Sequence, residues 1–205
     1  MHISDGILSV PVITAGFGVT VIGTIYGLRH LRYEDIPRAA FISSVFFTAS
    51  LIHVPAGLSS AHLILNGLVG LLAGFSAFPV ILTGLVLQAF FFSWGGITTL
   101  GVNTMDMALP ALLCGLLFRR WLCASVASPL KTAAIGFSAG AGAVFFSALM
   151  TAFMLYLSNG THLTAAKIIF TAHLPVIFAE GLITASICLF LRKVKPDLLK
   201  MEMEK

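Results

Sequence analysis

Seven apolar runs follow one another along the 205 residues, and they constrain the fold more than any other feature. Hydrophobic residues make up 58% of the chain and charged residues only 10%, a balance typical of integral membrane proteins. A helix that crosses a membrane takes about 20 apolar residues. We therefore predict an all-α integral membrane protein with a single domain over 1–205. The expected spans are Val10–Leu28, Ala39–Val54, Ala61–Phe75, Pro79–Trp94, Thr104–Phe118, Thr132–Leu157 and His173–Leu191.

Positive charges gather in short clusters between the apolar runs, as orientation in a bilayer requires. With seven spans, all of these clusters fall on one side of the membrane, and Lys167 alone falls on the other. Because cytoplasmic loops are enriched in Lys and Arg, we expect the N-terminus outside and the C-terminus inside. The net charge of +4 does not indicate nucleic-acid binding. The clustered cations are Arg29, Arg32, Arg38, Arg119, Arg120, Lys131, Arg192, Lys193, Lys195, Lys200 and Lys205.

The chain begins with Met1 and His2, and this pair is a potential metal chelate. The α-amine of Met1, the backbone nitrogen of His2 and Nδ1 of its ring can close one five-membered and one six-membered ring around a metal. This leaves one corner of a square plane, a geometry that suits Ni(II) or Cu(II). Residues 1–10 lack the basic region of a cleavable signal peptide, so we expect Met1 to be the mature terminus. The alternative is that His2 is an ordinary residue after the start codon.

The segment after the second expected span supplies a fourth ligand candidate. Pro55 and Gly57 interrupt the apolar pattern, and Ser59 or Ser60 can cap the following helix. We expect His62 in the first turn of that helix, where a rigid backbone would hold its ring in place. An interfacial histidine without a metal is the alternative. The expected topology puts five histidines on the outer face and His30 on the inner one; the outer five are His2, His53, His62, His162 and His173.

Two further segments carry polar groups at membrane depth. Residues 94–107 are expected to form a Gly-rich outer loop that folds inward, where Asn103 and Asp106 would orient a ligand ring by accepting its N–H. His173 and Glu180 are expected on one face of the last span, about 10 Å apart. An ionisable group inside a span is costly and indicates a function or a specific partner. For Glu180 a hydrogen bond to a neighbouring span is favoured over a proton relay.

Other classes of protein are excluded by what the sequence lacks. It has no G-x-x-x-x-G-K-[ST] motif, so it does not hydrolyse ATP in this way, and it has no HExxH motif. Its three cysteines are scattered and suggest neither a disulfide nor a thiolate metal site. We expect a transport protein rather than an enzyme.

Four motifs together resemble the CbiM/NikM family, the substrate-binding S components of energy-coupling factor transporters for cobalt and nickel. They are the Met-His-Ile-x-Asp-Gly start, the Gly-x-Ser-x-x-His stretch that ends at His62, the Gly-Gly-x-Thr-x-Leu-Gly-x-Asn loop, and the terminal His-Leu-Pro-x-x-x-x-Glu-Gly-Leu-Ile-Thr. The resemblance extends from residue 1 to about residue 199. Asp106 departs from the Asn that many members carry, and His53 is less expected and is a candidate entry ligand.

The resemblance implies seven membrane helices (10–191), an inserted metal-binding segment (1–9) and a cytoplasmic tail (192–205). It implies Met1, His2 and His62 as ligands of the transported Ni²⁺ or Co²⁺, with the loop around Asn103 in support and no catalytic cofactor. It also implies partners in a prokaryotic plasma membrane: a transmembrane coupling (T) protein, cytoplasmic ATPases and often a small accessory membrane protein. Such uptake commonly serves cobalamin synthesis or nickel enzymes.

Two other functions stay open from the residues alone. A stand-alone proton-coupled carrier would need acidic relays within the spans, and only Glu180 qualifies. A membrane haem protein would need paired histidines at matching depth, whereas most histidines here are expected near one surface.

Overall fold

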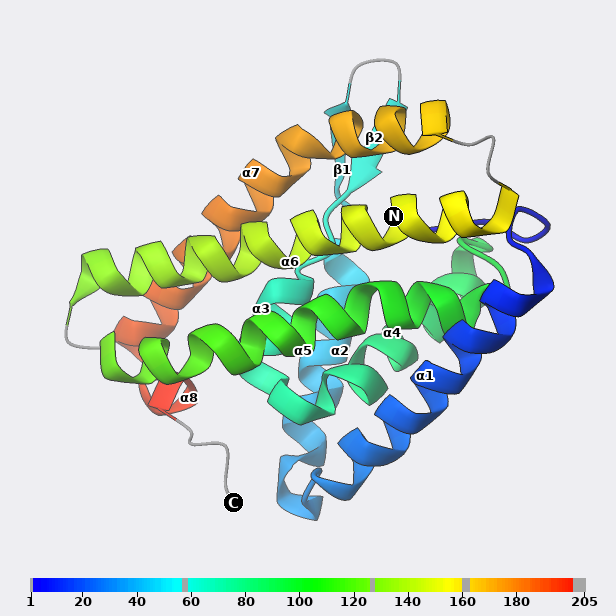
Figure 1. Ribbon diagram of the computed structural model, residues 1–205. Coiled ribbons are helices and arrows are strands. Elements are labelled where there is room, and N and C mark those ends of the chain that lie inside the picture. The colour runs from blue at the N-terminus through cyan, green and yellow to red at the C-terminus, as the bar shows by residue number, and fades with distance from the viewer. Residues whose placement is uncertain (1, 57–58, 126–127, 160–162, 201–205) are drawn as a thin grey trace.

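The computed structural model describes residues 2–56, 59–125, 128–159 and 163–200, and they are mostly helical (Figure 1). A two-stranded hairpin is the exception. The elements are α1 (Val10–Arg29), η1 (Tyr33–Asp35), α2 (Ile36–Ala49), β1 (His53–Ala56), β2 (Ser59–His62), α3 (Asn66–Ala73), η2 (Gly74–Ser76), α4 (Ala77–Phe92), α5 (Leu100–Ser125), α6 (Pro129–Asn159), α7 (Leu163–Val194) and α8 (Asp197–Lys200).

Five helical stretches in the described ranges are long and apolar enough to cross a membrane: Val10–Arg29, Asn66–Phe92, Leu100–Ala124, Pro129–Ser158 and His173–Val194. The prediction of an apolar helical membrane protein is thus confirmed. Two expected spans are not full-length helices, because α2 has 14 residues and α3 only 8. The Asn66–Phe92 stretch is not one straight rod either, since the chain turns at Gly74, where φ is +55°.

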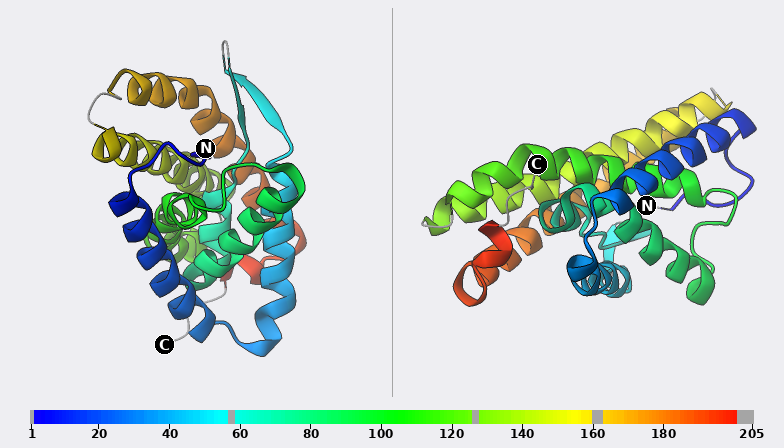
Figure 2. Two further views of the ribbon diagram at one scale, coloured as in Figure 1. Left: turned by 90° about the vertical axis from the view of Figure 1, so that its right-hand side faces the viewer. Right: turned by 90° about the horizontal axis from the view of Figure 1, so that it is seen from below.

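α5 and α6 lie side by side, and α2 runs across their direction (Figures 1 and 2). Hydrogen bonds between distant segments join the turns at two ends of the bundle. At one end, the hydroxyl of Ser76 donates to the carbonyl of Gly27, and Arg38 donates to the carbonyl of Leu72 at 2.7 Å. These bonds join the α1–α2 turn to the α3–α4 turn. At the other end, the backbone N–H of Ser9 donates to the hydroxyl of Ser158 at 3.1 Å, joining the start of α1 to the end of α6.

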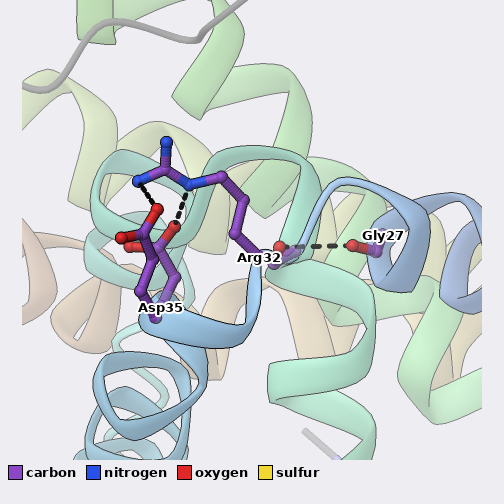
Figure 3. A network of polar contacts seen from close by, with 5 residues as sticks. Gly27, Arg32 and Asp35 are labelled. Atoms are coloured by element: carbon purple, nitrogen blue, oxygen red, sulfur yellow. Dashed lines mark hydrogen bonds and ion pairs between the residues drawn. The ribbon is translucent and has the colours of Figure 1, made fainter.

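The α1–α2 turn carries a small charged cluster (Figure 3). Arg32 pairs with Glu34 at 2.5 Å and with Asp35 at 3.2 Å. All three side chains are largely or partly exposed, so these pairs contribute little to stability. The two ion pairs instead hold the charged side chains of the turn together, at the end of the bundle where His30 also lies.

Close helix packing depends on small residues. A methyl group on Gly70 would lie 1.9 Å from the carbonyl oxygen of Ala111, so α3 and α5 approach each other backbone to backbone. A methyl group on Gly140 would lie 2.6 Å from Oγ1 of Thr184, which marks a similar approach between α6 and α7.

Two expectations about element boundaries are wrong. His62 does not begin a helix: it ends strand β2, and α3 starts four residues later at Asn66. Asn103 and Asp106 do not lie in a loop, because α5 already begins at Leu100. In both cases backbone pairing or packing with a distant segment moves the boundary that local composition suggests. His173 begins the last apolar span, as expected, although the helix α7 itself begins earlier, at Leu163.

Candidate metal centre

The amide of Asn103 holds the N-terminal segment in place. The backbone N–H of Ile3 donates to Oδ1 of Asn103 at 2.9 Å, and Nδ2 of Asn103 donates to the carbonyl of Ile3 at 3.0 Å. One side chain therefore satisfies both backbone groups of the residue that follows His2. Asn103 is 2% exposed, so both bonds are shielded from water. This pairing fixes the backbone path at the start of the chain.

A second anchor joins Asp5 to the segment before α5. Its carboxylate accepts hydrogen bonds from the backbone N–H of Thr98 at 3.1 Å and from the Thr98 hydroxyl. The Thr98 hydroxyl is the main cause that lowers the pKa of Asp5 below its usual value. A methyl group on Gly96 would lie 2.0 Å from Oδ1 of Asp5, so the segment fits only because residue 96 has no side chain.

Apolar side chains seat the same segment against the bundle. Ile3 and Leu8 are 4% and 7% exposed, and each buried aliphatic side chain contributes about 1.5–3 kcal/mol. Their buried partners come from α1, α5 and α6: Val12, Val102, Met105 and Leu155. Residues 3–8 are therefore a docked element and place His2 at a defined point.

The rings of His2 and His62 meet at this point. Their centroids lie 4.7 Å apart with the planes inclined by 22°, a stacked arrangement. Trp94 stacks on His62 with a centroid distance of 6.0 Å and lies 6.4 Å from His2. Two imidazoles from distant parts of the chain thus share one site beside an indole ring, at the end of the bundle opposite His30.

Burial keeps the His2 ring neutral. Burial is the main cause that lowers the pKa of His2 from 6.5 to about 2, and the positive charges of the amino terminus and of His62 contribute to the same lowering. Neutral imidazole is the form that binds metals. The Nε2 atom of His2 is buried and has no hydrogen-bond partner within the described part of the chain.

The segment that carries His62 is held from both sides. The backbone N–H of Leu63 donates to the carbonyl of Ile52 at 3.0 Å and extends the hairpin. Glu180 of α7 then accepts the backbone N–H groups of Ile64 and Leu65, the latter at 2.9 Å. Leu65 has a φ of +52°, a conformation that is uncommon for a non-glycine residue. The carboxylate thus stabilises the turn that leads from His62 into α3.

Asp106 lies in a buried polar cluster one helical turn beyond Asn103. The hydroxyl of Thr151 donates to Oδ2 of Asp106 at 2.7 Å, and the hydroxyl of Ser147 donates to its backbone carbonyl at 2.8 Å. Asn66 donates to the same Ser147 hydroxyl at 2.9 Å. The carboxylate therefore connects α5 to α6.

The remaining predicted site residues are less fully described. His173 is buried in α7, 8% exposed. His53 pairs with His62 in the backbone register of the hairpin, and Ser60 pairs with Pro55; the side chains of His53 and Ser60 lie outside the described part of the structure. Met1 also lies outside it, so its role as a ligand stays a prediction. The described ranges contain no cluster of three or more His, Cys, Asp or Glu side chains.

Comparison with known proteins places these features in a family. A family model described as "Cobalt uptake substrate-specific transmembrane region", CbiM, matches residues 2–198. The chain belongs to the CbiM family. The resemblance inferred from the four motifs is therefore confirmed, and the chain is a multi-pass membrane protein of a metal-transport family.

Individual relatives agree with this membership. A putative metal transport protein of Haemophilus influenzae is 38% identical over 200 residues, covering 97% of each chain. A putative fused nickel transport protein, NikMN, of Archaeoglobus fulgidus is 26% identical, covering 98% of this chain and 69% of its own. A crystal structure of a transition metal transporter has the same fold, with a TM-score of 0.74 at 24% identity over 95% of this chain and 93% of that one.

The sequence analysis missed two groups at this site. One is the Asp5–Thr98 anchor, which joins segments far apart in the chain. The other is Gln88, a fully buried amide in α4 that interacts with the His2 ring. An amide within the apolar run 77–92 was the available signal, because a polar side chain at membrane depth usually has a specific partner.

Proposed function

We propose that the chain is the metal-capture subunit of an ATP-driven importer of the energy-coupling factor type. Its substrate is Ni(II) or Co(II), which is also what the names of several relatives state for those proteins. The observation that carries the proposal is the 4.7 Å stacking of the His2 and His62 rings. Both rings come from motifs that carry the resemblance to the CbiM/NikM family, and both lie beside the docked N-terminal segment.

Four nitrogens form the proposed site: the amine of Met1, the backbone nitrogen and Nδ1 of His2, and one ring nitrogen of His62. The first three belong to one short covalent path, so docking residues 3–8 positions most of the ligand set before the metal arrives. Square-planar nitrogen ligation favours Ni(II) over ions that prefer a tetrahedral or octahedral shell. Nickel is thus our first choice and cobalt the second.

The site faces the outside of the cell in this proposal. Arg29, Arg32 and Arg38 lie at the opposite end of the bundle, and cationic ends are cytoplasmic as a rule. A metal arriving from outside would meet the imidazoles first. Since the sequence lacks a P-loop motif, ATP hydrolysis would be the task of separate ATPase subunits, joined through a membrane coupling protein.

Blocking the N-terminus tests the proposed ligand set. Adding one residue before Met1, or acetylating its amine, removes a nitrogen donor without altering the bundle. We expect nickel and cobalt binding to be almost abolished in a calorimetric titration. His62→Ala should weaken binding strongly. His30→Ala is the matched control, because His30 lies at the other end and bonds its own helix through the carbonyl of Tyr26. Unchanged affinity after acetylation would refute the proposal.

A further inference from the structure

Gln88 is a buried amide that the four-nitrogen site does not use. It lies in α4 and is 0% exposed. Neither Oε1 nor Nε2 of Gln88 has a hydrogen-bond partner among the described residues. Buried polar groups in proteins are nearly always hydrogen-bonded, so a buried amide whose two polar atoms lack partners calls for an explanation. The position of Gln88 next to His2 provides this explanation.

The C-terminal part of α4, which carries Gln88, lies at the His2 ring. Trp94 follows this helix by two residues, and its ring centroid lies 6.4 Å from that of His2. In agreement with this placement, Gln88 raises the pKa of His2, against the larger lowering caused by burial. The Nε2 atom of His2 is itself buried and without a partner in the described ranges. Two neighbouring side chains thus have complementary unused atoms.

The other nitrogen of the His2 ring, Nδ1, faces Gly95. A methyl group placed on Gly95 would lie 3.7 Å from this nitrogen and 3.0 Å from Nδ2 of Asn103. In the proposed chelate, Nδ1 must be the metal-binding atom, because only this nitrogen closes a six-membered ring with the backbone nitrogen of His2. A neutral imidazole that binds a metal through one nitrogen carries its proton on the other. The Nε2–H group therefore needs an acceptor.

We propose that Gln88 is a positioning residue for the metal: its Oε1 accepts the Nε2–H of His2 and so fixes the ring's tautomer and orientation. This inference rests on the proposed function. Such partners of ligating histidines raise the basicity of the ring and commonly change metal affinity by 10- to 100-fold. The amide is suited to this task because it stays neutral and adds no charge in the membrane.

Two substitutions separate this role from simple packing. Gln88→Met keeps the length of the side chain but removes the acceptor, and should weaken nickel binding by about 10- to 100-fold. Gln88→Glu restores an acceptor and should recover most of the affinity. The visible absorption band of the nickel complex should shift in Gln88→Met and return in Gln88→Glu, because it reports the ligand field and not the stability of the fold.

Ser43→Ala is the matched control. It removes a buried hydrogen bond from α2 to the carbonyl of Val80 in the same helix α4, away from the site. Nickel affinity and spectrum should stay as in the wild type even if thermal stability falls. A Gln88→Met protein with wild-type affinity and spectrum would overturn the inference while leaving the four-nitrogen site intact. A wild-type protein that binds no nickel would instead refute the proposed function.

A measurement on the wild type covers the case in which Gln88→Met does not fold. Square-planar Ni(II) is diamagnetic, so the nickel complex of protein with ¹⁵N-labelled histidine gives sharp imidazole signals. We expect an Nε2–H proton of His2 that is shifted downfield and protected from exchange with water. Rapid exchange of this proton would contradict the hydrogen bond to Gln88.

Discussion

At the scale of single residues, a few long-range hydrogen bonds hold the N-terminus where it can act. Asn103 pairs with both backbone groups of Ile3, and Thr99 adds a bond from its hydroxyl to the same carbonyl at 2.8 Å. A free chain end is ordinarily mobile unless such contacts hold it down. Ordering residues 3–8 in advance would lower the entropic cost of closing the proposed chelate around a metal.

Removing the Asn103 amide should therefore weaken metal binding. Asn103→Ala leaves the buried N–H of Ile3 without this acceptor, at about 1–3 kcal/mol. The Ile3 carbonyl keeps its bond from Thr99. We expect nickel affinity to fall by about tenfold to a hundredfold in a calorimetric titration, since the docked conformation becomes less populated. Ser44→Ala is a suitable control, because its hydroxyl bonds only within its own helix. Equal effects of the two substitutions would contradict the role of Asn103.

In the metal-free protein, protonation of His2 at acid pH should weaken the docking of residues 3–8 against the bundle. The pKa of His2 is lowered to about 2 in the docked state, whereas an undocked histidine has a pKa of about 6.5. Between these values the undocked segment binds a proton that the docked one does not, so docking weakens as the pH falls below 6.5. Asp5 stays charged in the upper part of this window, because hydrogen bonding from Thr98 lowers its pKa below 3.8.

Hydrogen exchange at pH 7.5 and pH 5 can check this expectation. The amide of Ile3 should exchange faster at the lower pH once the chemical exchange rate is corrected for. In His2→Phe, which keeps the ring but not the titration, exchange should respond much less to pH. The same pH dependence in both proteins would assign the effect to another group.

At the scale of elements, the β1–β2 hairpin and α7 together determine where His62 lies. Glu180 accepts the backbone N–H groups at the turn before α3, and α7 packs against both strands. A carboxylate near the N-terminus of a helix is also favoured by the helix dipole. The last helix is thus linked to the segment that follows His62, the proposed ligand, through the N–H groups of Ile64 and Leu65.

Substitution of Glu180 tests this link. Glu180→Gln retains one acceptor oxygen and should reduce nickel affinity modestly. Glu180→Ala leaves the N–H groups of Ile64 and Leu65 unpaired, and should lower both thermal stability and nickel affinity, by about 1–3 kcal/mol for each group. Unfolding followed by intrinsic fluorescence, together with nickel titration, can measure both effects. Wild-type affinity in a folded Glu180→Ala protein would show that α7 does not position His62.

The sequence predicts the long helices but not the elements around His62 and Asn103. Apolar runs locate α1, α4, α5, α6 and α7 because long apolar helices follow from composition alone. The placement of His62 in a helix fails, because strand pairing with His53 and a cap from Glu180 override the local pattern. The loop assigned to Asn103 fails in a similar way, since α5 extends to Leu100 to present that amide to Ile3.

At the scale of the whole molecule, the bundle has two chemically distinct ends. His2 and Asp5 lie beside the 93–99 segment, at the end where α1 begins, and the Arg32 cluster lies in the turn where α1 ends. The separation agrees with the orientation expected from the positive charges. In the proposed orientation, the capture site and the cytoplasmic surface lie on opposite sides of the membrane.

Labelling of single cysteines tests this orientation. Ile97 is 78% exposed near the site, and Tyr33 is 92% exposed in the α1–α2 turn. In a background without the native cysteines, Ile97→Cys should react with a membrane-impermeant maleimide in intact cells. Tyr33→Cys should react only in inverted vesicles. The reverse pattern would place the capture site on the cytoplasmic side.

X-ray absorption at the nickel edge tests the central claim most directly, because it reports the donors around the bound ion. For the wild-type protein the four-nitrogen site predicts a square-planar edge feature and four nitrogen donors, two of which are imidazoles. His62→Ala should lose one imidazole from this shell, whereas His30→Ala should keep both. A six-coordinate shell, sulfur donors, or an unchanged shell in His62→Ala would contradict the account.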